Sequence, residues 1–320
     1  MKTQSLPLGV DIGTARLRVA HAVRQRNGRC LRAVATRDVP AGAISAGGVS
    51  DVEYVAALLE DAVAELNTAE RRCIAAIGMP AASLRTLALP QMTAIERSRT
   101  ARFEAARHVD YPISEAVVCL RPVDGQGRLW ALGIARASAV QSKMSLLRRA
   151  GLRPLSLDDE GCAMRRAFPT FDGILDIGHH RSTLYVKGSL DAFQTQHGGA
   201  AITAGIQNDL RLDEPTAEKR KRILGTAGAG ERARQALVGH LAALIHSAKH
   251  ASPVRRIAVV GNGARLPHII RDVEQAGGVH CALAVSHVFN GEPYAEDVVA
   301  SSAADWTLAA TLASGATDDV

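Results

Sequence analysis

The sequence predicts a two-lobed α/β protein in which two copies of one supersecondary unit face a shared ligand. The first copy, Leu8 to Val19, reads L-G-V-D-I-G-T-A-R-L-R-V: an apolar strand ends at Asp11, Gly13 allows a sharp reversal, and an alternating strand follows. Gly173 to Val186, G-I-L-D-I-G-H-H-R-S-T-L-Y-V, repeats this pattern around Asp176. Repetition of a supersecondary unit indicates a duplicated fold. The chain of 320 residues is long enough for two domains.

The composition is that of a globular protein with few aromatic residues. Hydrophobic residues make up 47% and charged residues 22% of the chain, but aromatic residues only 3%. The core must therefore be built from Ala, Leu, Val and Ile. Few aromatic residues also argue against binding of single-stranded nucleic acid, which uses stacking platforms. The net charge of +6 is spread along the chain, and its densest run, Glu218 to Arg222, is expected to be a solvated helix face. No nucleic-acid partner is expected.

The cysteines and the N-terminus indicate a cytoplasmic protein. Five cysteines are scattered without a C-x-x-C motif, so neither a disulfide framework nor a zinc site is predicted. Met1 to Pro7 has no apolar signal core, and no stretch approaches 18 uncharged apolar residues. We expect no membrane segment of the chain's own, so that any work at a membrane requires recruitment.

Lobe one is expected to span residues 1–83 and to be completed by about residues 153–170. It opens as a three-stranded antiparallel meander, because Asn27-Gly28 joins two short apolar runs and is a strong hairpin signal. Ser50 is expected to cap the following helix, which has acids in its first turn. The predicted elements are strands at Leu17 to Val23, Cys30 to Ala35, Ile74 to Ile77 and Leu155 to Asp158, with helices at Asp51 to Leu66 and Gly161 to Ala167.

Residues 84–152 are expected to form an α/β subdomain inserted into lobe one. Leu84 to Leu89 alternates between apolar and polar residues, and a charged amphipathic pattern follows from Thr93 to Val109. Further strands are predicted at Ala116 to Leu120 and Leu129 to Ile134, and a helix at Ala137 to Leu152.

Lobe two is expected to span residues 171–205, to be completed by about residues 251–314, and to carry a small helical subdomain at residues 206–250. Its hairpin repeats that of lobe one, and its helices show apolar residues at helical spacing. Residues 315–320 are expected to be a frayed tail. The predicted strands are Leu184 to Lys187, Asp191 to Gln196, Arg256 to Val260 and Leu283 to Val285, and the predicted helices are Ile202 to Leu212, Thr216 to Leu224, Glu231 to His250 and Trp306 to Leu312.

Four motifs converge on one anionic ligand. The two D-I-G turns place Asp11 and Asp176 beside backbone amides, an arrangement typical of phosphate and Mg²⁺ sites. Gly198-Gly199 opens a helix, whose N-terminus favours an anion. Ile257 to Pro267 is a buried strand that runs into Gly-Asn-Gly, where a bulky ligand can approach the backbone. No Rossmann fingerprint, Walker A sequence or nucleophile motif is present, and the glycines of residues 225–230 are expected to be a linker.

The order of these motifs resembles that of the actin and sugar-kinase ATPase superfamily, whose fold is a duplicated ribonuclease-H-like lobe with nucleotide in the cleft. Four stretches narrow the resemblance to the PilM family of type IV pilus assembly proteins, which is similar to the cell-division protein FtsA. These stretches are Val39 to Asp51, Arg102 to Ile113, Leu147 to Leu157 and Ala217 to Lys221. The resemblance extends from residue 8 to about residue 314.

The resemblance implies an actin-like scaffold that binds ATP or ADP with Mg²⁺ between its lobes. It also implies a cytoplasmic location at the inner face of the inner membrane, with the N-terminal cytoplasmic tail of a PilN-like inner-membrane protein and other pilus assembly proteins as partners. The tail is expected to dock between the first lobe and the insert. Metal ligands would be Asp11 and Asp176. The implied nucleotide-binding residues are Asp11, Gly13, Thr14, Arg18, Asp176, Gly178, His179, Gly198, Gly199, Glu218, Lys221, Gly261, Gly263 and Ala264.

Two departures from the family pattern leave other functions open. Arg18 stands where relatives usually have Lys, and His179, His180 and Arg181 replace small or hydroxylated residues of the second phosphate turn. We therefore expect a weak ATPase at most. The alternatives are a nucleotide-free scaffold of a secretion or pilus system, an FtsA-like division protein and a small-molecule kinase, for which the sequence offers no catalytic base.

Overall fold

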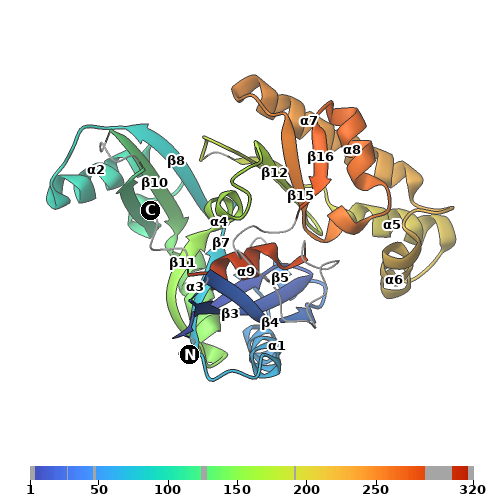
Figure 1. Ribbon diagram of the computed structural model, residues 1–320, viewed down its shortest axis with the longest axis horizontal. Helices are drawn as coiled ribbons and strands as arrows, with labels where there is room; N and C mark the ends of the chain where they lie inside the picture. Colours follow the sequence, from blue (N-terminus) through green and yellow to red (C-terminus); the bar gives the residue numbers. More distant parts are fainter. Residues whose placement is uncertain are drawn as a thin grey trace.

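Two α/β lobes lie side by side, and a smaller insert extends from the first of them (Figure 1). This computed structural model describes residues 4–26, 28–45, 48–123, 128–190, 192–284 and 305–315. Within the described residues, no helix is both long enough and apolar enough to cross a membrane.

Lobe one is built on a mixed sheet with the order β4-β3-β2-β7-β11, in which β1 also pairs with β3. Strands β2, β3 and β4 form the predicted antiparallel meander, and β2, β7 and β11 run parallel. The carboxyl ends of the parallel strands therefore meet at one edge of the sheet. The strands are β1 (Gln4–Ser5), β2 (Leu8–Ile12), β3 (Arg16–Gln25), β4 (Gly28–Asp38), β7 (Arg72–Ile77) and β11 (Arg153–Asp159), and β5 (Ile44–Ser45) pairs with β6 (Gly48–Val49) outside this sheet.

Lobe two repeats this sheet strand for strand, which confirms the predicted duplication. Its order is β14-β13-β12-β15-β16, again with an antiparallel meander followed by parallel strands. The strands are β12 (Gly173–Ile177), β13 (Ser182–Val186), β14 (Ala192–Thr195), β15 (Arg256–Val260) and β16 (His280–Leu283). The last strand lies earlier than the predicted Leu283 to Val285, and Val285 lies outside the described residues.

The insert is a three-stranded antiparallel sheet, β8-β10-β9, with one face covered by α2. Trp130, Leu132 and Ile134 are buried on that face, and Thr93 and Glu96 form a capping box at the start of α2. Its elements are β8 (Ala82–Ala88), α2 (Ala94–Ala106), η1 (Ile113–Glu115), β9 (Ala116–Pro122) and β10 (Leu129–Arg136).

The helix α3 (Ala137–Arg149), which the sequence placed in the insert, contributes to the core of lobe one. Its Leu146 and Leu147 are buried with Val55 and Leu59 of α1 (Val52–Glu65). We therefore place the end of the insert at β10 rather than at residue 152. The cap of α1 also differs from the prediction: Asp51 accepts the bond from the Tyr54 amide, at 2.9 Å. The Ser50 hydroxyl instead donates to the carbonyls of residues 42 and 43.

The helices of lobe two share one core with its sheet, so residues 206–250 have no separate core. Ile202, Leu237 and Ile245 are buried together with Leu175 and Leu184 of the sheet. The helices of this lobe are α5 (Gly199–Leu210), α6 (Glu214–Leu224), α7 (Glu231–Ala251), η2 (Asn262–Arg265) and α8 (Ile269–Gly277).

The last helix, α9 (Thr307–Ala313), packs on lobe one, which corrects the expectation that residues up to 314 complete lobe two. Ala309 and Ala313 are buried with Leu6, Ala20 and Leu31 of the first sheet. A further core joins the lobes, because α4 (Glu160–Ala167) and α9 pack there against residues of both sheets. The chain thus returns to its first lobe in its last described helix.

Candidate functional site

The first strand of each lobe ends in the same turn. The Gly13 amide donates to the Arg16 carbonyl at 2.9 Å, and the Gly178 amide donates to the Arg181 carbonyl at 3.0 Å. Asp11 and Asp176 occupy equivalent positions on β2 and β12, opposite Arg18 and Thr183 on the neighbouring strands. The duplication therefore aims two carboxylates at the space between the lobes.

That space is a cleft with a volume of about 1120 Å³, lined by both lobes and by the base of the insert. Its volume is enough for a ligand of nucleotide size. Eight of the fourteen predicted site residues line it, namely Asp11, Gly13, Thr14, Arg18, Asp176, Gly178, His179 and Gly261.

Carboxylates and cations lie together in the part of the cleft lining that we call its floor, formed by Asp11, Arg18, Lys143, Glu160, Asp176 and Arg181. Arg18 Nη1 donates to Asp11 Oδ2 at 3.1 Å, so the first aspartate is already paired. Burial raises the pKa of Asp176 to about 6; the Asp11 carboxylate also raises it, while Arg18 and Arg181 oppose the shift. Because Asp11 makes ionisation of Asp176 less favourable, a proton or a cation at Asp176 would relieve the repulsion.

Glu160 and Lys143 complete this floor, and the sequence motifs identified neither. Burial raises the pKa of Glu160 to about 7, although Arg181 and Lys143 oppose the shift. Lys143 lies in α3 and donates to the Ala76 carbonyl at 2.7 Å; its burial lowers its pKa. The signal for Glu160 was its position at the start of a helix after a parallel strand, next to the ends of β2 and β7. That position can be recognised only when the order of the strands in the sheet is known. The spacing of residues along the chain does not reveal it.

Arg181 crosses from lobe two to lobe one. Its guanidinium donates to the Met79 carbonyl and lies 3.8 Å from the Glu160 carboxylate. The two histidines before it also line the cleft, and their rings lie edge to face with centroids 4.3 Å apart. Burial lowers the pKa of His179 to about 4, so this ring is neutral near pH 7.

Further contacts join the lobes at the cleft through Asn262, which is not among the predicted site residues. Its Oδ1 accepts from Arg18 at 3.1 Å and from Arg16 at 3.5 Å. Asp38 of lobe one lies 2.9 Å from Arg16 and 3.8 Å from Arg222 of α6. The lobes are therefore held together at this cleft by polar contacts.

The glycines of the predicted phosphate loops are required by the fold itself. A Cβ on Gly198 would lie 2.5 Å from the His179 carbonyl oxygen, and one on Gly263 would lie 2.2 Å from Ile177 Cγ2. The amides of Gly199 and Ala200 at the start of α5 donate to the carbonyls of residues 178 and 179. These two amides therefore already have protein partners and are not available to the anion that this helix start was expected to favour.

Six predicted site residues lie beside the cleft rather than in its lining. They are Gly198, Gly199, Glu218, Lys221, Gly263 and Ala264. Lys221 is only 6% exposed and lies 2.6 Å from the Glu218 carboxylate, which also accepts from Thr203 at 2.6 Å. This buried network ties α6 to α5, next to His179.

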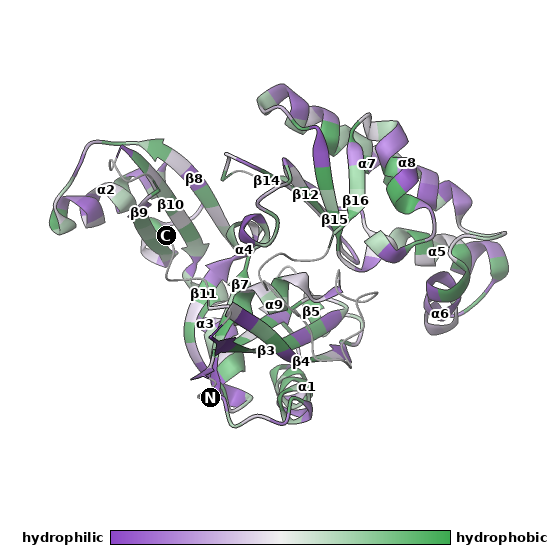
Figure 2. Ribbon diagram, viewed as in Figure 1, coloured by the Kyte–Doolittle hydropathy of each residue, from purple (hydrophilic) through white to green (hydrophobic). Residues whose placement is uncertain are grey.

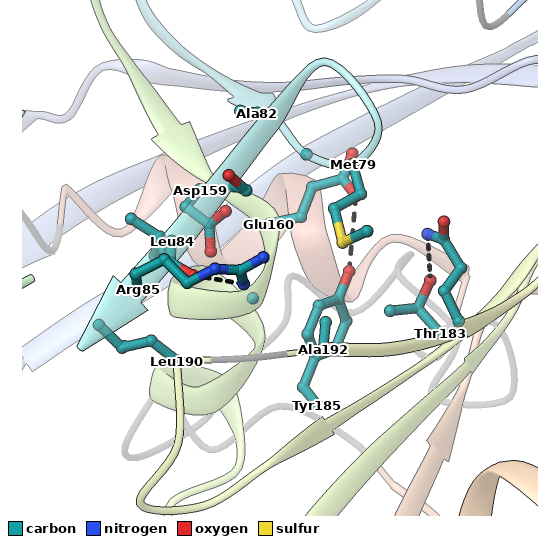
Figure 3. A pocket seen from close by; sticks show the side chains of 14 residues that line it. Met79, Ala82, Leu84, Arg85, Asp159, Glu160, Thr183, Tyr185, Leu190 and Ala192 are labelled. Carbon is teal, nitrogen blue, oxygen red and sulfur yellow. Dashed lines mark hydrogen bonds between the residues drawn. The ribbon is translucent and has the colours of Figure 1, made fainter. Parts of the chain in front are cut away.

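A second, much smaller cavity of about 20 Å³ lies where β8, α4 and the β13–β14 hairpin meet. Figure 3 shows Glu160 and Tyr185 facing each other there, with Arg85 at the side; the Tyr185 hydroxyl lies 3.5 Å from Glu160 Oε2. Its volume suits a water molecule and no larger ligand. We regard it as part of the junction between the insert and the lobes.

The side chains of the cleft floor fit a metal–phosphate group. Arg18 Nε is buried and has no hydrogen-bond partner among the described residues, so a donor is available beside Asp11. No three His, Cys, Asp or Glu side chains of the described residues form a metal-binding group. Two carboxylates are nevertheless the usual protein contribution to Mg²⁺, which takes its other ligands from water and phosphate.

Comparison with known proteins decides the family. A model of the type IV pilus assembly protein PilM family matches residues 9–316. The chain belongs to the PilM family.

The structural comparison agrees with this assignment. The solved PilM–PilN type IV pilus biogenesis complex matches with a TM-score of 0.81 and 23% identity, over 96% of this chain and 97% of that one. The ethanolamine utilization protein EutJ from Carboxydothermus hydrogenoformans matches with a TM-score of 0.61 and 16% identity, over 98% and 90% of the two chains. No curated protein matches in sequence. This PilM-family protein therefore has the actin-like ATPase fold expected from its sequence.

Proposed function

We propose that this type IV pilus assembly protein binds ATP or ADP with Mg²⁺ between its lobes and holds the cytoplasmic tail of a PilN-like inner-membrane protein. The observation that carries the nucleotide site is the cleft floor, where Asp11, Asp176 and Glu160 face Arg18, Lys143 and Arg181. Bound Mg²⁺ would neutralise phosphate charge there. Asp11 and Asp176 would hold the ion, and the three cations would hold phosphate oxygens.

Nucleotide titration by calorimetry tests this site. Asp11→Ala or Asp176→Ala should weaken Mg²⁺-dependent binding at least about tenfold, roughly 1.4 kcal/mol. Asp61→Ala, which removes an exposed carboxylate of α1, is the matched control. Unchanged affinity in both cleft variants would remove the proposed metal ligands.

The peptide site is proposed where the cleft extends between lobe one and the insert. That arm is lined by Ile44 and Val49 of the β5–β6 hairpin, by α3, and by Tyr111, over whose ring Arg136 lies at 3.8 Å. The solved complex similar in structure contains PilN with PilM. An apolar groove with a cation at its rim suits an ordering peptide segment.

Two serines of α3 give a matched test of the groove. Both are exposed, but Ser142 lines the cleft, whereas Ser145 is not among its lining residues. Ser142→Arg should abolish capture of a PilN-like tail peptide in a pull-down, and Ser145→Arg should not. Equal capture by both variants would place the peptide elsewhere.

We propose a cytoplasmic location at the inner membrane through this partner.

A nucleotide-free scaffold is the second candidate, and one observation favours it. Asn262 already bridges the lobes by accepting hydrogen bonds from Arg18 and Arg16. The Gly178 amide of the second turn and the Gly199 and Ala200 amides at the start of α5 also have protein partners. A protein of this kind needs no ligand to close its cleft. Absence of any calorimetric signal with ATP or ADP, with peptide capture intact, would favour this function.

A further inference from the structure

One edge of lobe one carries arginines that neither the cleft nor the peptide groove uses. From Arg24 to Arg32 the sequence reads R-Q-R-N-G-R-C-L-R, with four arginines and no acidic residue. This segment is the end of β3 and the start of β4, the tip of the longest hairpin in the described sheet. Arg26 and Arg32 are exposed. Because they lie near the tip of a hairpin, these side chains are at the outer edge of lobe one.

The sheet brings further arginines to the same edge. Arg72 and Arg153 begin the parallel strands β7 and β11 and lie opposite each other in register. Arg72 Nη2 donates to the Ser5 carbonyl at 3.3 Å, and Ser5 pairs with Val23 of β3, next to the hairpin tip. We call the whole set the arginine edge: Arg24, Arg26, Arg29, Arg32, Arg71, Arg72 and Arg153. Figure 2 shows hydrophilic stretches in purple at this end of the sheet, beside the label N.

The arginine edge is unfavourable for the isolated fold. Arg24 lies opposite Arg29 in the hairpin, as Arg72 lies opposite Arg153, and like charges at such positions destabilise a sheet. Glu70 supplies one opposite charge, at 2.6 Å from Arg72. The exposed side chains of Arg26 and Arg32 are accessible to solvent or to a partner.

We propose that the arginine edge rests on an anionic membrane surface and binds lipid phosphate groups. Guanidinium groups pair with phosphate oxygens in a bidentate manner, and several cations near an anionic leaflet bind it together. The segment Arg24 to Arg32 contains no aromatic residue, which disfavours stacking on single-stranded nucleic acid.

The topology leaves the proposed nucleotide site accessible in this orientation. The carboxyl ends of β2 and β7 line the cleft, whereas the arginine edge is formed at the amino ends of the parallel strands. A membrane at one end of the sheet therefore does not cover the cleft at the other. This contact is independent of nucleotide and of the PilN-like tail, so its test is separate from theirs.

Vesicle co-sedimentation of the full chain tests the proposal. The probes are vesicles of phosphatidylcholine with phosphatidylglycerol and vesicles of phosphatidylcholine alone. Binding is expected to the anionic vesicles only, and to be lost near 1 M salt, where the Debye length is about 3 Å. The variant Arg26→Gln/Arg29→Gln/Arg32→Gln should bind at least about tenfold more weakly, because each cation near an anionic surface contributes to affinity.

A matched control removes the same charge from lobe two. Arg232→Gln/Arg255→Gln/Arg271→Gln changes three exposed arginines and should keep full vesicle binding. Both variants are compared by thermal unfolding, and restoring the hairpin cations as lysine should recover most of the binding. Equal loss in the two triple variants, binding to neutral vesicles, or binding to an oligonucleotide but not to vesicles would each overturn the proposal.

Discussion

The ionised side chain of Asp176 destabilises the folded protein, and this makes the stability of the protein depend on pH. Burial raises its pKa from 3.8 to about 6. Between these values the folded state binds a proton that the unfolded state has lost, so stability falls as the pH rises through this window. Above about pH 6 both states are ionised and the loss is complete. A raised carboxyl pKa thus destabilises the unliganded protein at neutral pH.

Asp176→Asn should therefore stabilise the unliganded protein near pH 8 by on the order of 1 kcal/mol, because the buried charge is gone. The gain should shrink towards pH 4, where the native carboxyl is protonated. Chemical denaturation at several pH values measures this. Asp61→Asn, on the exposed face of α1, should show no such gain. A variant less stable than the parent at every pH would contradict the pKa argument.

His179 is expected to crowd the cleft rather than to bind phosphate by charge, because its lowered pKa keeps the ring neutral near pH 7. His179→Ala should raise nucleotide affinity a few-fold, with hydrolysis staying below about 1 per second, the low end of enzyme turnover. Calorimetry and a single-turnover assay measure the two effects, with the exposed His197→Ala as control. Loss of affinity in His179→Ala would mean that the ring contacts the nucleotide.

At the scale of elements, the fit of α9 on β2 depends on one glycine. A Cβ at Gly9 would lie 1.9 Å from the Ala309 carbonyl oxygen and 2.4 Å from the Ala313 nitrogen. Gly9→Ala should therefore destabilise the protein by about 1–3 kcal/mol or more, as overpacking does. Gly239 in α7 has no atom within 4 Å of its Cβ position, and Gly239→Ala should stabilise by up to about 1 kcal/mol. Urea denaturation compares the pair, and equal effects would contradict the packing assigned to α9.

Local patterns were enough to predict most of these elements. The alternation around Asp11 and Asp176 gave the two equivalent hairpins, because a strand, a turn and a strand are determined by neighbouring residues. The positions of α3 and α9 were missed for the opposite reason. The position of each helix depends on the core in which its apolar side is buried. The sequence around Leu147 or Leu308 does not show which sheet that side contacts.

The same distinction separates the site residues that were predicted from those that were missed. Residues on the two turns were found because the turn and its acid are contiguous. Glu160 and Lys143 were missed because they reach the cleft from helices outside these motifs. Asn262 lies within the Gly-Asn-Gly motif, but only the glycines of that motif were predicted to be functional. The glycine motifs were attributed to ligand binding alone, but close packing within the fold already requires glycine at positions 198 and 263.

At the scale of the whole molecule, Asn262 links the two halves of the cleft. Asn262→Ala removes the acceptor shared by Arg16 and Arg18 and should let the lobes separate further. Small-angle scattering should then show a larger radius of gyration, with Asn208→Ala on the exposed end of α5 unchanged. An unchanged radius in both variants would mean that the shared core around α4 and α9 holds the lobes by itself.

The return of α9 to lobe one has a consequence for the order in which the protein assembles on the ribosome. Lobe two is contiguous from β12 to β16 and has its residues available as soon as that stretch has left the exit tunnel. Lobe one is made first but finished last, because Leu6, Ala20 and Leu31 stay uncovered until α9 is synthesised about 280 to 300 residues later. During synthesis the N-terminal sheet therefore exposes an apolar face, the kind of surface that chaperones bind.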